Sequence, residues 1–306
     1  MIEKKAPVAG GLLYFTGIKP TFTDSPAHPG RKIKPTMTDE AVMNRNNVRV
    51  SGSGRQAMVF AHGFGCDQHM WRYLTPAFQD DYRIVLFDYV GSGRSDPNAY
   101  DEDRYGQMSG YTDDLLEVCH ALGLREAIFV GHSVSCMIGL LAANRDPKLF
   151  AKMIFIGPSP RYLNDGGYIG GFERGDIREL LETMDKNYVG WANFLGPQIM
   201  KNPDRPELAA ELTDSFCSTD PRMARKFAEV TFLSDNRRDL ADLHIPSLIL
   251  QCSDDLIAPL EVGQYLNAHL ADSTLRVLKA TGHCPHLSEP EETISMMQKY
   301  LKDSLP

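Results

Sequence analysis

Short and almost wholly apolar runs recur along the chain from Asn47 onward. The clearest are rich in β-branched or aromatic residues and lie at 57–61, 83–88, 127–130, 153–157 and 246–251. A strand that is apolar at every position is buried on both faces, which is typical of a parallel sheet covered by helices. Stretches with a helical pattern, such as 113–124 and 136–146, lie between these runs. The alternation predicts a doubly wound α/β sheet.

The alternation stops between about residues 158 and 240. Several helical patterns follow one another there without a strand between them. Asp220 followed by Pro221 has the order of a helix start, with the acid as the cap and the proline in the first turn. We therefore expect an all-helical cap inserted over the carboxyl ends of the strands, where ligands bind in open α/β sheets.

The amino-terminal part of the chain has a different composition. Residues 1–36 contain five prolines and show no sustained period. The segment 6–20 resembles a weak signal peptide, but glycines interrupt its apolar centre and no A-x-A cleavage site follows. We therefore expect a flexible extension over residues 1–46 and a single α/β domain over 47–306.

Composition and charge narrow the classes of function. Hydrophobic residues make up 42% and charged residues 24% of the chain, as in ordinary soluble enzymes. A net charge of −8 disfavours nucleic acid and anionic membranes as partners. No apolar stretch approaches the ~20 residues of a membrane span. The six cysteines show no CxxC pair, which indicates reduced thiols in a cytoplasmic chain.

One five-residue segment, Gly-His-Ser-Val-Ser at 131–135, lies between an expected strand and an expected helix. A serine on such a sharp turn can be a nucleophile held above the sheet, and the usual pattern is G-x-S-x-G. Here Ser135 replaces the last glycine, so a plain turn serine at Ser133 is the alternative interpretation. The position two after the nucleophile needs a small side chain, which a serine supplies. His132 is expected to line the pocket wall.

Glycines after the first buried strand favour the catalytic interpretation. Gly63 and Gly65 allow the backbone to pass close to a ligand. The amides of Phe64 and Val134 are then placed to bind a developing oxyanion. A plain glycine-rich turn is the alternative.

An acid and a histidine complete the pattern, in the chain order serine, acid, histidine that is typical of hydrolases with this turn. Asp254 and Asp255 end a predicted strand, and His283 follows a later one. His283 is expected to act as the general base for Ser133. His286 is interpreted as a loop or capping residue. No histidine cluster of the HExxH kind and no dinucleotide fingerprint is present, so we expect neither a metal nor a cofactor.

The chain resembles a known family over roughly residues 47–303. The resemblance is to the RsbQ-type α/β-hydrolases, which regulate the bacterial general stress response, and more distantly to the plant karrikin and strigolactone receptors. It rests on the segments FAHGFGCDQHMW, FDYVGSGRSD, FVGHSV, GPSPRYLND, GGFE, DRPELAAEL, FCSTDP, SLILQCSDDLIAP and GHCPHLSEP. It implies one α/β-hydrolase domain with a four-helix cap over a small apolar pocket.

The resemblance also implies roles for individual residues. The triad would be Ser133, Asp255 and His283, with Asp255 four residues before Pro259 as in the family. Pocket walls would include Tyr162, Trp191 and Leu195. From its position in the helical insertion, we also expect Phe194 on the inner face of the cap. The alternative is that these rings only pack the cap onto the core.

Two classes of function need the same triad. One is a serine hydrolase of a small hydrophobic ester or lactone, with an acyl-enzyme intermediate. The other is a ligand-responsive regulator that activates a partner phosphatase, of the PP2C type, in general stress signalling. The residues alone do not separate them.

Overall fold

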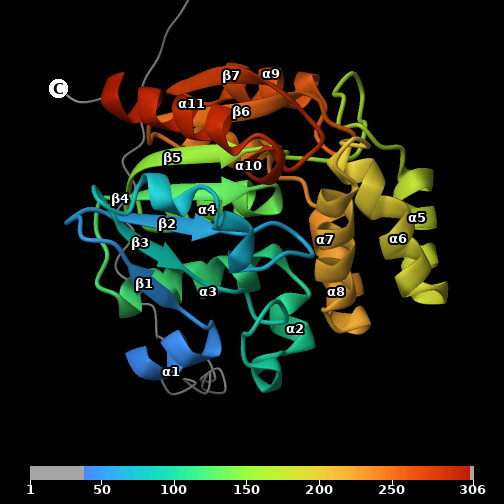
Figure 1. The fold of residues 1–306 in the computed structure, drawn as a ribbon, viewed down its shortest axis with the longest axis horizontal. Helices are drawn as coiled ribbons and strands as arrows, with labels where there is room; N and C mark the ends of the chain where they lie inside the picture. The colour runs from blue at the N-terminus through green and yellow to red at the C-terminus, as the bar shows by residue number, and fades with distance from the viewer. Residues whose placement is uncertain (1–37, 304–306) are drawn as a thin grey trace, which may run out of the picture. The chain divides into compact units, whose positions relative to one another are not determined.

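The computed structural model of the chain describes residues 38–303. Residues 1–37 of the expected extension therefore lie outside the described part of the chain. Within the described range a seven-stranded sheet has the order β1-β3-β2-β4-β5-β6-β7 (Figure 1). All neighbouring strands are parallel except β1 and β3. The strands are β1 (Arg49–Ser51), β2 (Ala57–Ala61), β3 (Arg83–Leu86), β4 (Ala127–His132), β5 (Phe150–Ile156), β6 (Ser247–Asp254) and β7 (Ser273–Thr281).

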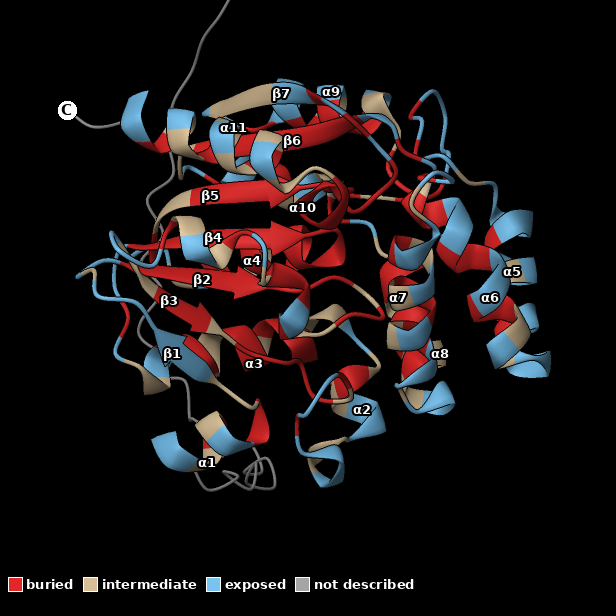
Figure 2. Ribbon diagram, in the orientation of Figure 1, coloured by how far each residue is buried: buried red, intermediate tan, exposed pale blue. Residues whose placement is uncertain are grey.

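Helices cover both faces of the sheet. Residues of α3, α4 and α9 share one hydrophobic core with alternate residues of the strands, and α11 belongs to the core on the opposite face. The helices outside the segment between β5 and β6, apart from α1, are α2 (Glu102–Tyr105), α3 (Met108–Ala121), α4 (Val134–Arg145), α9 (Leu260–His269), α10 (Pro285–Ser288) and α11 (Pro290–Asp303). The central strands are buried throughout, whereas β1 at the edge is exposed (Figure 2). The prediction of a mainly parallel α/β sheet is confirmed.

Short 3₁₀ turns link several of these elements. They are η1 (Gln68–Trp71), η2 (Thr75–Ala77), η3 (Pro97–Ala99) and η4 (Arg237–Asp242).

The packed part of the chain begins before the expected boundary at residue 47. Helix α1 (Asp39–Arg45) is capped by the Thr38 side chain and places Val42 in the core beneath α3. Arg45 is buried and pairs with the carboxylates of Asp114 and Glu117. Residues 39–46 thus belong to the packed unit, because these contacts anchor them, and not to the extension.

Four helices follow β5 and lie beyond the carboxyl ends of the strands (Figure 1). They are α5 (Arg174–Lys186), α6 (Tyr188–Met200), α7 (Pro206–Cys217) and α8 (Pro221–Phe232), and we refer to them as the cap helices. Helix α8 begins as its sequence predicts, with the Asp220 carboxylate accepting from the N–H groups of Arg222 and Met223. The inner faces of the cap helices join the core on one side of the sheet.

No helix among the described residues has both the length and the apolar character needed to cross a membrane.

Candidate active site

Ser133 occupies a strained turn between β4 and α4. Its φ is +56°, a conformation that costs energy for a residue with a side chain and that holds a nucleophilic serine above a sheet. The serine N–H donates to the Ile156 carbonyl on the neighbouring strand at 2.9 Å. Gly131 is required below it, because a Cβ there would lie 2.6 Å from the Phe129 ring. The local backbone is therefore shaped around this one serine.

Ser135, which replaces the usual glycine, is fully buried. Its hydroxyl donates to the carbonyl of His62, and its oxygen lies 3.1 Å from the Tyr89 hydroxyl. The serine thus satisfies two buried polar groups and links the start of α4 to the loop after β2. The departure from glycine adds contacts that a glycine would lack.

Ser133, His283 and Asp255 form a continuous hydrogen-bonded chain. The Ser133 Oγ lies 2.8 Å from His283 Nε2, and His283 Nδ1 lies 2.7 Å from Asp255 Oδ2. All three side chains are buried. A carboxylate at Nδ1 keeps the proton on that nitrogen and leaves Nε2 free to accept from the serine.

The two adjacent acids at the end of β6 have different environments. Asp255 also accepts hydrogen bonds from the N–H groups of Ile257 and Ala258, which hold its carboxylate in place. The side chain of Asp254 is 61% exposed and pairs with Lys201. Of these two acids, only Asp255 is hydrogen-bonded to His283.

The loop after β2 runs directly beside the serine. A Cβ on Gly63 would lie 2.4 Å from His132 Nδ1 and 3.3 Å from the Ser133 Cβ, so only glycine allows this approach. It brings the Phe64 residue alongside the nucleophile, while Val134 begins α4. Neither the Phe64 nor the Val134 amide donates a hydrogen bond to another described residue. Both remain available as the expected oxyanion donors.

A small apolar cavity opens at the serine. Its volume is about 30 Å³, which is room for one or two water molecules. His132, Tyr162 and Leu195 line it as the sequence predicts. The Tyr162 hydroxyl lies 3.4 Å from the Ser133 Oγ, and burial raises the pKa of this phenol. Residues not foreseen complete the wall, among them Ile199, Leu212, Phe216 and Phe232.

Two aromatic residues expected at the cavity lie elsewhere. Trp191 is buried behind the wall, stacked on Tyr188 and 5.1 Å from the Phe216 ring between centroids. Phe194 is 71% exposed and points away from the core. Helix α6 turns Leu195 and Ile199 inward, so Phe194, one position before Leu195, falls on its outer face. The sequence shows that α6 is apolar on most sides, which hides this orientation.

Three buried side chains lie close together behind the triad. Potential ligand atoms of His132, Cys284 and His286 are within 4.8 Å of one another, the one such group among the described residues. His132 donates from Nε2 to the His283 carbonyl, and the His286 ring packs on Trp71. Burial raises the pKa of the Cys284 thiol well above its ordinary value. The side chains of this group therefore pack against other parts of the protein.

Burial disfavours the charged form of both histidines of this group. Burial lowers the pKa of His286 to about 3 and that of His132 well below its ordinary value. The expectation that His286 is a loop or capping residue is wrong, because it lies fully buried in α10. Its ring packs against those of Trp71 and His132.

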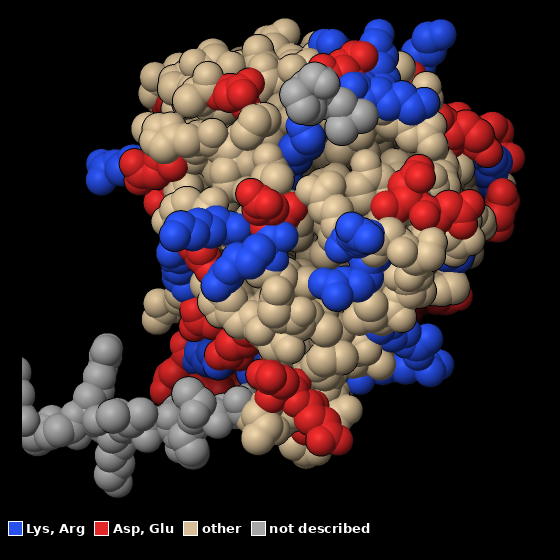
Figure 3. All heavy atoms as spheres, turned by 90° about the vertical axis from the view of Figure 1, so that its left-hand side faces the viewer, with Lys and Arg blue, Asp and Glu red and all other residues tan. Residues whose placement is uncertain are grey.

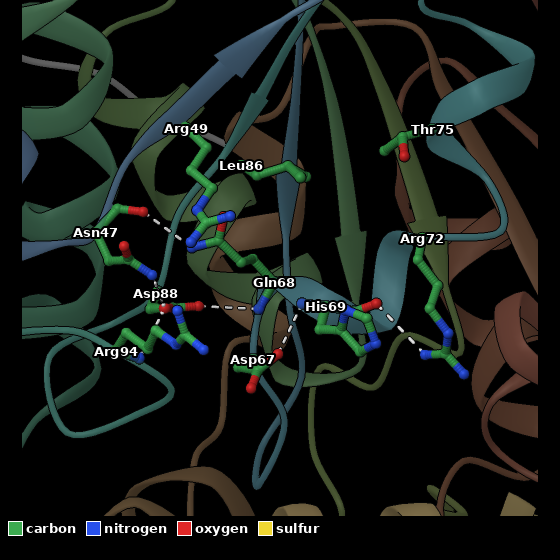
Figure 4. A pocket seen from close by; sticks show the side chains of 10 residues that line it. All are labelled: Asn47, Arg49, Asp67, Gln68, His69, Arg72, Thr75, Leu86, Asp88 and Arg94. Carbon is green, nitrogen blue, oxygen red and sulfur yellow. Dashed lines mark hydrogen bonds between the residues drawn. The ribbon is translucent and has the colours of Figure 1, made fainter.

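Larger hollows lie on the surface away from the triad. One of about 600 Å³ has walls from β1, η1 and the loop after β3, and contains none of the three triad residues. Figure 4 shows that its side chains are mostly charged or polar, including Arg49, Arg72 and Arg94. The Asp88 carboxylate in its wall is occupied by the N–H groups of Gln68 and Arg94. Size alone therefore does not locate the candidate active site.

Comparison with known proteins identifies the family. The model of the alpha/beta hydrolase family matches residues 58–296. The chain belongs to the alpha/beta hydrolase family. It is 38% identical to a strigolactone esterase of Arabidopsis thaliana, over 88% of this chain and 100% of that protein. It is 36% identical to a karrikin insensitive 2 receptor of Petunia hybrida, over 85% of this chain and 97% of the receptor.

A solved structure is similarly close. A hydrolase from Oleispira antarctica superposes with a TM-score of 0.85 at 40% identity, covering 88% of this chain and 98% of that one. The predictions of the α/β-hydrolase fold and of an enzyme of this fold are confirmed. The likeness to karrikin and strigolactone receptors is confirmed as well, whereas the RsbQ type stays a prediction.

Proposed function

We propose that this alpha/beta hydrolase is a serine hydrolase that cleaves a small hydrophobic ester or lactone. The observation that carries the proposal is the buried chain from Ser133 through His283 to Asp255, with the serine on a strained turn. Strain of this kind is retained where a fold positions a reactive group. The name of the strigolactone esterase relative supports ester hydrolysis in particular.

The geometry accounts for each step of acyl transfer. His283 takes the proton from the Ser133 hydroxyl as its oxygen attacks the carbonyl carbon. The carbonyl becomes an oxyanion that the amides of Phe64 and Val134 stabilise, at about 3 kcal/mol for each donor. The ester C–O bond then breaks, and the imidazolium gives its proton to the leaving alcohol. Water hydrolyses the acyl-enzyme by the same route in reverse.

The cavity limits the substrate. About 30 Å³ beneath the cap helices holds only a very small acyl group, and its wall is almost wholly apolar. The Tyr162 hydroxyl, 3.4 Å from the Ser133 Oγ, is a polar group of this wall outside the triad. We propose that the cap helices are part of a cap over about residues 158–240. This cap must move outward to admit a larger ester or lactone.

A serine-directed fluorophosphonate tests the nucleophile. We expect the probe to add its mass to the peptide that contains Ser133 and to abolish hydrolysis of small esters such as p-nitrophenyl acetate. The Ser133→Ala variant should neither be labelled nor hydrolyse the ester. Equal labelling of the variant, or labelling of another serine, would contradict the proposal.

A second function, which we propose as the alternative, is favoured by the receptor names among the relatives and by the small size of the cavity. In it the chain is an RsbQ-like regulator in the cytoplasm, which binds a small ligand and then activates a PP2C-type phosphatase. Charges support a protein partner over nucleic acid: basic and acidic side chains are intermingled on the face away from the cap helices (Figure 3). Ligand-dependent stimulation of such a phosphatase by the wild type would support this role, and phosphatase rates unchanged by the chain with or without ligand would exclude it.

A further inference from the structure

Cap helix α6 ends against the loop that carries His283. We call residues 281–289 the histidine loop. The N–H of His283 donates to the Ile199 carbonyl in the last turn of α6 at 2.8 Å. Gly282 is in direct contact with the same turn, because a Cβ on it would lie 2.1 Å from the Met200 carbonyl oxygen. The backbone of the cap thus touches the backbone of the catalytic histidine.

The segment between α6 and α7, residues 201–205, holds the start of this loop. We call it the connector. It begins with Lys201 at a φ of +53°, which turns the chain sharply. The Asn202 side chain is 9% exposed and donates from Nδ2 to the carbonyls of Met200 and Thr281. Thr281 in turn donates from its hydroxyl to the Lys201 carbonyl at 3.4 Å.

The connector also holds the end of the loop. Arg205 donates from Nη1 to the Ser288 carbonyl at 2.6 Å and from Nη2 to the Glu289 carboxylate at 3.0 Å. The same guanidinium donates to the Asn202 Oδ1. A planar guanidinium can satisfy these acceptors together, whereas a lysine ammonium has no such fork.

Two side chains of the connector are therefore hydrogen-bonded to the loop that carries the general base, Asn202 at its start and Arg205 at its end. The His283 ring must keep its Nε2 2.8 Å from the serine, and small misplacements of a catalytic group are costly. Among the described residues, no other side chain of the cap helices or the connector hydrogen-bonds to this loop.

We propose that Asn202 and Arg205 are positioning residues for His283, and that they make the alignment of the triad depend on the position of the cap helices. With the cap seated, the histidine loop is held and the serine is activated. When the cap moves outward to admit a ligand, α6 draws the connector away and the histidine loosens. Hydrolysis is then confined to the closed state. This inference rests on the proposed hydrolase function.

Substitutions in the connector test the proposal against a matched arginine of the cap. Arg205→Ala and Asn202→Asp should lower kcat for a small ester by about 10–100-fold, with KM within about twofold. Asn202→Asp keeps the acceptor for Arg205 but loses the donor to Thr281. Arg225→Ala is the control, because Arg225 also pairs with two carboxylates, Asp185 and Glu229, but lies in α8 away from the histidine loop. It should leave kcat unchanged.

Amide hydrogen exchange gives a readout that does not need activity. In the full-length protein, the peptide spanning 281–289 should exchange at least several-fold faster in Arg205→Ala than in the wild type and in Arg225→Ala. Arg205→Lys should restore only part of the protection, because it lacks the fork. Wild-type kcat and exchange in both connector variants, or losses matched by Arg225→Ala, would overturn the proposal. A wild type that is neither labelled nor active would instead contradict the hydrolase function, while hydrogen exchange would still test whether the connector holds the histidine loop.

Discussion

The Nδ1 atom of His283 lies 2.7 Å from Oδ2 of Asp255. The residue before Asp255 in the sequence is a second aspartate, Asp254. A carboxylate at this nitrogen holds the tautomer and stabilises the imidazolium that forms when the serine loses its proton. Asp254 instead pairs with Lys201 at the surface. This difference between adjacent acids yields the first prediction.

Asp255→Asn should lower kcat by a factor on the order of 10⁴, because the amide reverses the tautomer of His283. Asp254→Asn should change kcat only slightly, since it removes no bond to the histidine. Steady-state hydrolysis of a small ester by the purified variants is the measurement. The reverse ranking of the two variants would reassign the triad acid.

Ser135 should contribute to stability more than to chemistry. Ser135→Gly is expected to leave kcat within a fewfold, because the helix already accommodates a small residue. It should still lower the free energy of unfolding by about 1–3 kcal/mol, because it leaves buried partners at His62 and Tyr89 without a bond. Ser135→Leu should destabilise further by overpacking. Urea unfolding measures both, and an unchanged midpoint for the leucine variant would contradict the packing argument.

Leu195 and Trp191 should have separate effects on acyl-chain selectivity. Leu195 lines the cavity, so Leu195→Ala enlarges it and should raise kcat/KM for butyryl relative to acetyl esters by about 10-fold. Trp191 packs behind the wall, so Trp191→Ala should lower the thermal stability and reduce kcat/KM for both esters alike. Equal ratios of butyryl to acetyl activity in Leu195→Ala and the wild type would show that Leu195 does not limit the acyl group.

Buried histidines should make the fold sensitive to acid. The pKa of His286 is lowered to about 3 in the folded chain from an ordinary 6.5, so between these values the unfolded chain binds the proton and the folded chain does not. Stability is therefore fully present above about pH 6.5 and decreases as the pH falls. The slope from this residue is roughly 1 kcal/mol per pH unit.

The His286→Gln variant should lose part of that slope between pH 7 and pH 5, measured as the change in unfolding free energy. His244→Gln is the control, because His244 is exposed at the surface. A His286→Gln variant with the full wild-type slope would show that His286 is not the group that titrates on unfolding.

Local sequence patterns were enough to predict the central strands of the sheet, the tight serine turn and the order of serine, acid and histidine, but not the exposed edge strand β1. Apolar runs such as 57–61 and 127–130 mark buried strands because hydrophobic periodicity is a local property of the chain. The short spacing in 131–135 likewise fixes a turn between a strand and a helix. The expected end of the extension at residue 46 is too late, because the contacts of Val42 and Arg45 with α3 join segments far apart in the sequence.

Which residues meet depends on how whole elements pack against one another. Asp254 and Asp255 are chemically identical, and the choice between them depends on how the end of β6 faces a loop 28 residues away. The inward turn of Leu195 and the outward turn of Phe194 depend on how α6 packs on α7. The hold of Asn202 and Arg205 on the histidine loop joins segments about 80 residues apart. Such contacts follow from the packing of whole elements, which no local pattern of residues encodes.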